Sequence, residues 1–334
     1  MKLAIQEQTS MPHPYDSLTP DCVVDCLESI GLTCDLRLLA LNSYENRVYQ
    51  VGVEGGDPVI LKFYRAERWS DQQILEEHAF AQELVDHEIS VVAPELIDGV
   101  TLHHALGQRF SVFKRRGGYP PELDNLDHLY RLGQTLGRIH RVGRSKPFLH
   151  RRNLSATRMA TESRLFVEND FVPVELKSAY TSLARDCDEA ATQILSGMTE
   201  GDTQRIHGDC HVGNILWRDD TPHFVDLDDC ISGPVIQDIW MFLNGDRHQR
   251  EQQLGDFIAG YEEFNDFDPR QLAWIEALRT LRIMHHSAWL ARRWDDPAFP
   301  KAFPWFGHQR FWADHILELR EQLSAMSETS LRLL

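Results

Sequence analysis

The segment HGDCHVGNILWRDDTPHFVDLDD, residues 207–229, combines residue types that could transfer a phosphoryl group. His207, Asp209 and Asn214 form an HxDxxxxN arrangement, and Asp226 follows twelve residues after Asn214. A carboxylate at Asp209 could accept the proton of an attacking hydroxyl. Asn214 and Asp226 offer the hard oxygen ligands that Mg²⁺ prefers when it bridges phosphates. We therefore take Asp209 and Asp226 as catalytic candidates, and Asn214 and Asp226 as metal ligands.

A β-hairpin is predicted to hold these groups. Two apolar runs, residues 215–217 and 223–225, flank the turn-like residues 219–222. Such a hairpin carries the catalytic loop at one end and the metal carboxylate at the other. If the strand continued past Asp226, Asp228 would share its face and Asp229 would point the opposite way.

Two other interpretations of this segment use the same residues. His207, Cys210 and His211 could bind zinc, but no second Cys/His pair lies nearby at ligand spacing. Asp209 and Asn214 could be turn and cap residues, which are common roles for Asp and Asn. That explanation covers each residue singly, whereas it leaves the order His, Asp, Asn, hairpin, Asp unexplained.

A nucleotide site is predicted upstream. Lys62 lies in the apolar strand VILKF, where a lysine is either a surface residue or a ligand of the ATP phosphates. The following helix carries Glu76 and Glu77 as possible ion-pair partners, and we choose Glu77 because it lies beside the apolar face of that helix. The polar turn over residues 41–47 could receive phosphate on its N–H groups and on the Ser43 hydroxyl, or could be an ordinary hairpin turn.

Composition limits the classes of function. The chain has 334 residues, 42% of them hydrophobic and 25% charged, which suits about two globular domains. The net charge of −17 argues against nucleic-acid binding, and no apolar run of about 18 residues predicts membrane insertion. Six cysteines without a regular spacing, and an N-terminus unlike a signal peptide, predict a reduced, cytoplasmic protein.

The order of elements predicts an α+β protein. Residues 1–16 are expected to form a loose tail, and Thr19 to cap a helix that Gly31 closes. Strands are predicted over 38–53, 59–64, 91–93 and 110–113, and helices over about 70–86 and 125–141. After the hairpin the chain is predicted to be almost wholly helical, with a core built around tryptophans 240, 274, 289, 294, 305 and 312.

Several longer segments resemble the bacterial stress response kinase A family, Ser/Thr protein kinases with the aminoglycoside-phosphotransferase fold, itself similar to that of protein kinases. They are LNSYENRVYQV (41–51), KFYRAERWS with QILEEH (62–78), HGDCHVGNILWRD (207–219), VDLDD with GPVIQDIWMFLNGD (225–246) and ARRWDDPAFPKAFPWF (291–306). The resemblance covers residues 17 to 315. It implies a two-lobed fold, with a β-rich ATP-binding lobe over 1–113 that includes one helix, and a mainly helical catalytic and substrate lobe over 114–334.

The same resemblance implies an ATP- and Mg²⁺-dependent kinase, monomeric and cytoplasmic, that acts on Ser/Thr hydroxyls of a protein during stress and is itself a phosphoprotein. It assigns proton acceptance to Asp209, Mg²⁺ to Asn214 and Asp226, and the ATP site to Ser43. The residues alone leave open a small-molecule kinase of the aminoglycoside, choline or homoserine kinase type, because the nucleophile is a hydroxyl in both cases. The acidic charge and the lack of a long segment after Asp226 are compatible with that alternative. A catalytically inactive binding module would have to lack one of the candidate residues, and none is missing.

Overall fold

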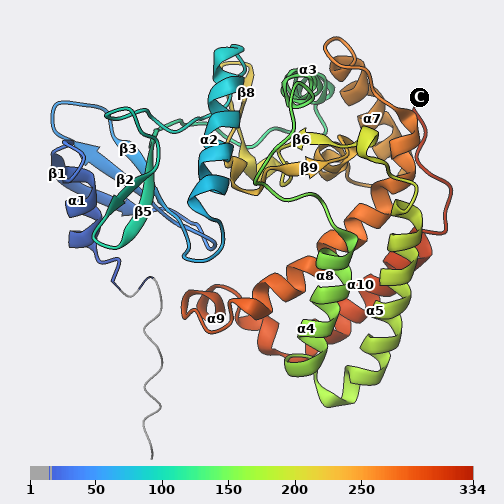
Figure 1. Ribbon diagram of the computed structural model, residues 1–334. Coiled ribbons are helices and arrows are strands. Elements are labelled where there is room, and N and C mark those ends of the chain that lie inside the picture. The colour runs from blue at the N-terminus through green and yellow to red at the C-terminus, as the bar shows by residue number, and fades with distance from the viewer. Residues whose placement is uncertain (1–14, 16, 334) are drawn as a thin grey trace, which may run out of the picture. The chain divides into compact units, whose positions relative to one another are not determined.

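The computed structural model describes residues 15 and 17–333 (Figure 1). Contacts between Cα atoms divide the chain into two compact units. The first unit comprises residues up to Asp71 together with Pro94–Arg115, and the second comprises Gln72–Ala93 and Arg116–Leu334. The helix at 71–86 therefore belongs, from Gln72 on, to the second unit. The predicted lobes 1–113 and 114–334 remain a prediction about domains.

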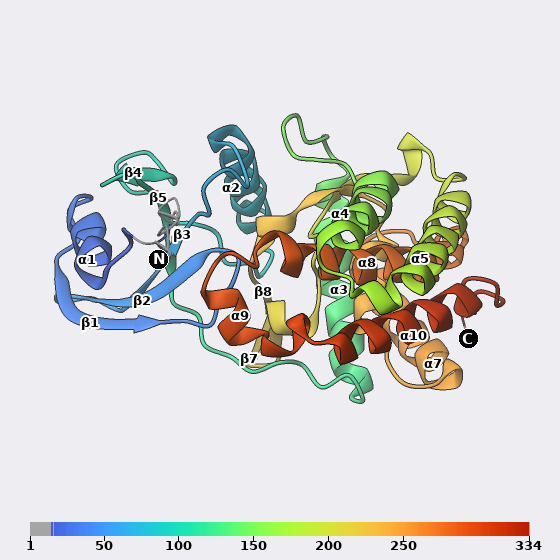
Figure 2. The ribbon, with the colours of Figure 1, turned by 90° about the horizontal axis from the view of Figure 1, so that it is seen from below.

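The first unit is an antiparallel sheet with one helix. The five strands run in the order β1-β2-β3-β5-β4 (Figures 1 and 2). Thr19 caps helix α1 through its side chain, Pro20 occupies the first turn, and Gly31 follows the helix with a positive φ, as the sequence predicts. The elements are α1 (Pro20–Glu28), β1 (Cys34–Ala40), β2 (Arg47–Val53), β3 (Val59–Phe63), β4 (His103–Ala105) and β5 (Gln108–Lys114).

The core of this unit lies between α1 and the sheet. Val23, Cys26 and Leu27 from the helix pack with Leu61 and Phe110 from the strands. Most residues of the predicted N-terminal tail lie outside the described residues. Tyr15 is described, and it is buried against the same core rather than loose.

The second unit is mainly helical, as predicted (Figures 1 and 2). Helices α4, α5, α8 and α10 pack together, and α3 packs against α7. The helices are α2 (Asp71–Asp86), α3 (Leu126–Gly143), α4 (Glu162–Asp170), α5 (Val174–Leu195), α6 (Ile236–Ile239), α7 (Arg247–Tyr261), α8 (Ile275–Arg292), α9 (Ala298–Ala302) and α10 (Gln309–Ala325).

Helices α3 and α7 pack with their backbones in contact. A Cβ on Gly133 of α3 would lie 2.0 Å from the carbonyl oxygen of Phe257, and one on Gly260 of α7 would lie 2.0 Å from that of Tyr130. These backbones therefore touch at positions where only glycine fits. The helix predicted over 125–141 is α3, and its apolar stripe is fully buried, at Leu129, Leu132, Leu136 and Ile139.

Two small antiparallel sheets complete the second unit. The pairs are β6 (Gln204–Ile206) with β9 (Ile231–Gly233), and β7 (Ile215–Arg218) with β8 (Thr221–Phe224). The β7–β8 hairpin confirms the prediction. Arg218 pairs with Thr221, so the turn consists of two residues, Asp219 and Asp220. Both have positive φ, as a type I′ turn requires.

Three predictions about elements are wrong in detail. The residues predicted as a strand over 38–53 belong to two strands, β1 and β2, which the turn between them separates. Residues 91–93 do not form a strand of their own: Val91 makes one isolated parallel bridge to Phe224, and the N–H of Val92 donates to the Phe224 carbonyl at 3.0 Å. The tryptophan core is also smaller than expected. Trp240, Trp274 and Trp312 are buried, whereas Trp305 is 42% exposed.

Candidate active site

The catalytic loop runs from β6 through His207, Gly208 and Asp209 to a short 3₁₀ turn, Val212–Asn214, and then into β7. Gly208 has a φ of +85°, and a Cβ there would lie 2.2 Å from the carbonyl oxygen of Asp229. The loop thus lies directly against the segment that follows β8. A left-handed residue without a side chain is required at this point.

Hydrogen bonds join the loop to the end of the hairpin. The His207 ring Nε2 lies 2.9 Å from the Val225 carbonyl oxygen, and the Val225 N–H donates to the Asn214 carbonyl at 3.0 Å. The Asn214 amide Nδ2 donates to the Asp209 carbonyl at 2.9 Å. The structure therefore brings Asp209, Asn214 and Asp226 into one segment of the second unit, as the sequence order suggested.

Asp226 has an unusual backbone conformation. It lies in the left-handed region, with a φ of +58° and a ψ of +63°, and its side chain is exposed. Residues 227–229 then form a 3₁₀ turn, in which Asp228 is only 2% exposed. The expectation that Asp228 shares a strand face with Asp226 is wrong, because the strand ends at Phe224 and strand alternation does not apply beyond it.

A buried carboxylate, Asp238 of α6, accepts backbone hydrogen bonds from the catalytic loop. Its Oδ2 accepts the N–H of His207 at 2.7 Å, and its Oδ1 accepts that of Gly208 at 2.8 Å. The His140 ring Nε2 lies 3.0 Å from the same Oδ2, and the His140 Nδ1 lies 3.0 Å from the Tyr261 hydroxyl. Asp238 and His140 are fully buried. The carboxylate therefore fixes the two residues that precede Asp209.

Asp209 has a guanidinium group and an imidazole ring beside it. Arg282 of α8 forms an ion pair with its Oδ1, and the His211 ring Nε2 lies 3.5 Å from its Oδ2. Burial by itself would raise the pKa of Asp209, but the hydrogen bond from His211 and the charge of Arg282 outweigh it and lower the pKa well below the usual range. Asp209 is therefore ionised at neutral pH, as a group that orients a hydroxyl must be.

A further buried arginine, Arg151, supports the segment after Asp226. Its Nε donates to the Cys230 carbonyl at 2.9 Å, and its Nη2 donates to that of Asp228. Glu76 of α2 accepts the N–H of Leu149 at 2.5 Å, of His150 at 2.8 Å and of Arg151 at 2.7 Å. The Glu76 carboxylate thus serves the 149–151 backbone, which suits the choice of Glu77 for the lysine. Glu77 is 3% exposed, and its pairing with Lys62 remains a prediction.

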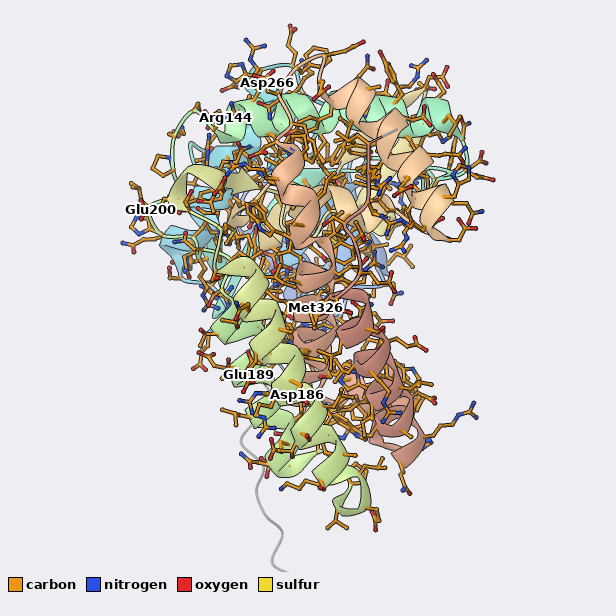
Figure 3. The ribbon with its side chains drawn as sticks, turned by 90° about the vertical axis from the view of Figure 1, so that its right-hand side faces the viewer. Arg144, Asp186, Glu189, Glu200, Asp266 and Met326 are labelled. Atoms are coloured by element: carbon orange, nitrogen blue, oxygen red, sulfur yellow. The ribbon has the colours of Figure 1, made fainter. Side chains whose placement is uncertain are left out.

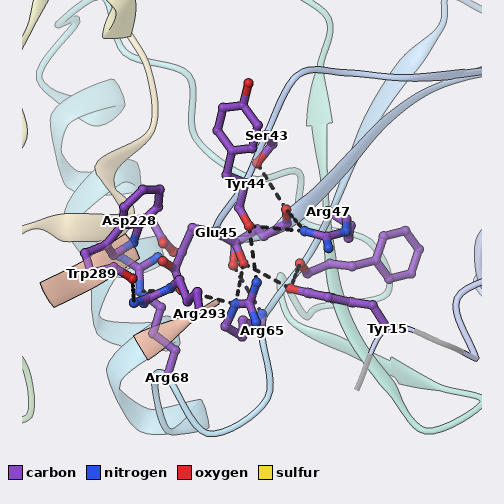
Figure 4. A network of polar contacts seen from close by, with 12 residues as sticks. Tyr15, Ser43, Tyr44, Glu45, Arg47, Arg65, Arg68, Asp228, Trp289 and Arg293 are labelled. Atoms are coloured by element: carbon purple, nitrogen blue, oxygen red, sulfur yellow. Dashed lines mark hydrogen bonds and ion pairs between the residues drawn. The ribbon is translucent and has the colours of Figure 1, made fainter. Parts of the chain in front are cut away.

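In the first unit, Lys62 is 6% exposed on β3, and Ser43 lies in the β1–β2 turn. Figure 4 shows how this turn is held. The Ser43 hydroxyl donates to the Asn46 carbonyl at 3.2 Å. The Arg65 guanidinium donates to the carbonyls of Tyr44, at 3.2 Å, and Glu45, at 2.9 Å. The carbonyl groups of the turn are therefore directed at cationic and hydroxyl donors inside this unit.

The zinc interpretation finds no support in the residues that the structure describes. They contain no group of three or more His, Cys, Asp or Glu side chains positioned to hold a metal ion. His207 instead bonds to the Val225 carbonyl, and Cys210 is buried, which raises the pKa of its thiol.

Sequence reasoning missed Asp238, His140 and Arg282 as parts of the site. His140 and Asp238 are 98 residues apart, and Arg282 and Asp209 are 73 apart. No local spacing reports such long-range contacts. The available signal was weak: a carboxylate in an otherwise apolar stretch, VIQDIW, and a histidine on the apolar face of a helix.

Comparison with known proteins assigns the chain to a family. The sequence profile of the phosphotransferase enzyme family matches residues 37–275. Stress response kinase A of Escherichia coli O157:H7 is 44% identical over 321 residues, covering 96% of this chain and 97% of the relative. The serine/threonine protein kinase RdoA of Salmonella typhimurium strain LT2 is 42% identical over 320 residues, covering 96% and 97%. This chain belongs to the stress response kinase A family.

Solved structures of phosphotransferases share the fold of this family member. Amicoumacin kinase hAmiN, solved with AMP-PNP, Ca²⁺ and its ligand, has a TM-score of 0.73 at 21% identity and covers 94% of this chain and 95% of its own. Spectinomycin phosphotransferase APH(9)-Ia has a TM-score of 0.65 at 14% identity, with coverages of 90% and 98%. The expected aminoglycoside-phosphotransferase-type α+β fold is confirmed.

Family membership also confirms that this chain is a kinase, an ATP-binding enzyme that transfers a phosphoryl group to an acceptor. The chemical nature of the acceptor and the identity of the metal ion are treated as proposals below. Among the described residues, no helix has the length and the hydropathy needed to cross a membrane.

Proposed function

We propose that this family member is an ATP- and Mg²⁺-dependent Ser/Thr protein kinase of a bacterial stress response. The observation that carries the proposal is the construction around Asp209. An ionised carboxylate stands on a loop that Asp238 fixes. Asn214 lies at the end of this loop, and its carbonyl accepts the N–H of Val225, the residue before Asp226. The identity of 44% with stress response kinase A supports the stress context, and the identity of 42% with the serine/threonine protein kinase RdoA supports the protein acceptor.

The residues fit a divalent cation. The Asn214 amide nitrogen is committed to the Asp209 carbonyl, which assigns its other amide atom as the oxygen. Together with the Asp226 carboxylate, it supplies two hard oxygen ligands of the kind that Mg²⁺ takes beside phosphates. When bound, the ion neutralises phosphate charge. We propose Asn214 and Asp226 as its protein ligands.

The transfer itself requires little from the protein beyond placement and charge. The acceptor hydroxyl oxygen forms a bond to the γ-phosphorus, the bond from that phosphorus to the β–γ bridging oxygen breaks, and ADP leaves. The hydroxyl proton goes to the Asp209 carboxylate. Because the pKa of Asp209 is low, the carboxylate mainly orients the hydroxyl and takes the proton late in the reaction.

Lys62, Glu77 and Ser43 are proposed to bind the nucleotide. In a trans peptide the C=O of one residue and the N–H of the next point in opposite directions. Since the carbonyls of Tyr44 and Glu45 face Arg65, the N–H groups of Glu45 and Asn46 point away from it. That orientation suits a turn that receives phosphate oxygens. Lys62 would contact the phosphates as an ammonium, with Glu77 as its ion-pair partner.

A small-molecule acceptor is the second candidate. The 3₁₀ turn Leu227–Asp229 and strand β9 follow Asp226 directly, so the chain forms no long segment there on which a peptide could lie. We retain the protein acceptor because the relatives at more than 40% identity include one named as a serine/threonine protein kinase. The monomeric state, autophosphorylation and a cytoplasmic location are further proposals, as is the absence of nucleic-acid partners.

Labelled-ATP transfer by the purified protein tests the proposal. It is measured alone, with generic protein acceptors, and with a panel of amino alcohols and sugars. We expect transfer to protein Ser/Thr, and a loss of about 10²–10⁴-fold in Asp209→Asn with the fold and ATP binding retained. Asp219→Asn, an exposed turn residue of the same hairpin, is the matched control and should keep full activity. Transfer only to a metabolite would refute the protein acceptor, and a fully active Asp209→Asn would refute the assigned base.

A further inference from the structure

The distribution of charge near Asp209 is opposite to that of the whole chain. The net charge is −17, and acidic residues such as Asp186 and Glu189 lie on α5 (Figure 3). Two segments of the same unit differ. Residues 151–161 and 280–293 contain no Asp or Glu, and together they carry arginines 151, 152, 158, 282, 292 and 293.

One of these segments, residues 280–293 of α8 and its end, contains the arginine that pairs with the catalytic aspartate. Arg282 of α8 forms the ion pair with Asp209 while its side chain stays 39% exposed. His285 and His286 follow at three and four residues, which places them on the same side of the helix. Arg292 is exposed and lies ten residues further on, about 15 Å along the axis. The basic face of α8 therefore extends away from the reacting group.

The other segment packs against this face. The Ser163 hydroxyl lies 3.4 Å from His285 Nδ1 and donates to the Arg158 carbonyl at 3.2 Å. Burial, and then the charges of Arg292, Arg158, Arg293 and Arg282, lower the pKa of His285 to about 3. His285 is therefore neutral, and the arginines provide the positive charge. Glu162 and Asp229 offset part of the charge of Arg158, and Glu162 part of that of Arg292.

We propose that the acceptor is an acidic segment of a protein, and that Arg158 and Arg292 bind its negative side chains while its hydroxyl reaches Asp209. This inference rests on the proposed function and assigns its substrate class. Guanidinium groups are suited to carboxylates and phosphates, and in a chain of net charge −17 such a surface attracts anions only locally. Such a surface disfavours a cationic acceptor, although the acidic charge of the whole chain would suit one.

The length of this surface predicts the spacing in the substrate. A face of about 15 Å matches about four to five residues of an extended peptide, at about 3.3 Å per residue. Acidic side chains are therefore expected within about five residues of the acceptor hydroxyl, on one side of it. The side is determined by comparing peptides with Glu only before, or only after, the acceptor serine.

The test uses the full chain and three serine peptides of equal length, flanked by Glu, Ala or Lys. An anionic hydroxy acid, glycerate, and a cationic amino alcohol, aminopropanol, are measured beside them. The variants are Arg158→Gln, Arg292→Gln and the double variant. Arg185→Gln on α5 is the matched control, because it removes an exposed arginine whose ion pairs are with Asp186 and Glu189 of its own helix.

We expect the Glu peptide to be preferred, and each variant to raise its KM about fivefold, with about twentyfold for the double variant. The KM for the Ala peptide and for ATP should change less than twofold, and Arg185→Gln should change nothing. Where turnover of a peptide is too slow, its binding is measured by fluorescence anisotropy.

Equal use of the three peptides, or preference for the Lys peptide or aminopropanol, would overturn the proposal. A rise in the KM for ATP instead of the peptide would assign the arginines to the nucleotide and also overturn it. Arginine-dependent transfer to glycerate alone would overturn the protein acceptor. Failure of the kinase function itself is distinguishable, since it would appear as an absence of any Asp209-dependent turnover of ATP.

Discussion

Replacing Asp238 by asparagine tests whether this buried carboxylate positions the catalytic loop. Oδ2 of Asp238 accepts the His207 N–H and lies 3.0 Å from His140 Nε2, and Oδ1 accepts the Gly208 N–H. Asparagine has one oxygen only. With that oxygen in the position of Oδ2, its NH₂ group faces the Gly208 N–H, so two donors oppose each other beside a fully buried side chain.

The magnitude follows from these contacts. One buried backbone N–H without an acceptor costs about 1–3 kcal/mol, and loss of the negative charge weakens the remaining bonds. We expect unfolding free energy to fall by about 2–4 kcal/mol. Relief of the clash moves Gly208, and Asp209 with it. A displacement of about 1 Å at a reacting group costs about 10²-fold in rate.

Urea denaturation measures the stability, and kcat is measured where the variant is fully folded. Asp188→Asn is the matched control. Asp188 is also a buried carboxylate, accepting the Thr161 hydroxyl at 3.0 Å and Arg164 Nε at 2.9 Å, and it lies outside the catalytic loop. Both variants should lose stability, and only Asp238→Asn should lose kcat. A folded Asp238→Asn enzyme with wild-type kcat would refute the positioning role.

Three further predictions concern the nucleotide, the metal and the pairing of α2. Lys62→Ala should reduce kcat/KM for ATP about 10–100-fold, because a charged hydrogen bond to phosphate contributes about 1.5–3 kcal/mol, whereas a surface lysine would leave the kinetics unchanged. ATP binding should need a divalent cation in the wild type, lose that dependence in Asp226→Ala and retain part of it in Asn214→Ala; equal binding in EDTA would contradict the metal site. Glu83→Gln should destabilise the fold by about 1–3 kcal/mol at pH 7, because Glu83 pairs with the buried Arg205 at 2.8 Å. Although burial by itself raises the pKa of Glu83, its bonds to Arg205 and Lys146 lower it, so this stability is present above the unfolded-state pKa and lost as the pH falls through the lower folded-state pKa. Thermal melts from pH 7 to pH 3 should therefore converge for the two proteins, and a gap that persists at pH 3 would argue against the ion pair.

The sequence alone was sufficient wherever the information is local. The capping threonine and proline of α1, the apolar stripe of α3 and the two apolar runs around Asp219 and Asp220 specify their elements through contacts a few residues apart. The prediction that Asp209, Asn214 and Asp226 lie close together is based on local sequence for the same reason. A tight hairpin leaves its two ends adjacent, whatever the rest of the fold does.

Only the tertiary structure decided what surrounds these groups. Asp238 and Arg282 reach the catalytic loop across 30 and 73 residues of chain, and His140 reaches Asp238 across 98. Helix packing, with glycine contacts between α3 and α7, rather than local propensity, brings them there. The same is true of the residues after Phe224, where the strand ends. Asp226 then adopts a left-handed conformation, so strand alternation does not reach Asp228. Local spacing thus identified the reacting groups, whereas burial and long-range hydrogen bonds determined their charge states and their orientation, because both depend on contacts that form only when the chain folds.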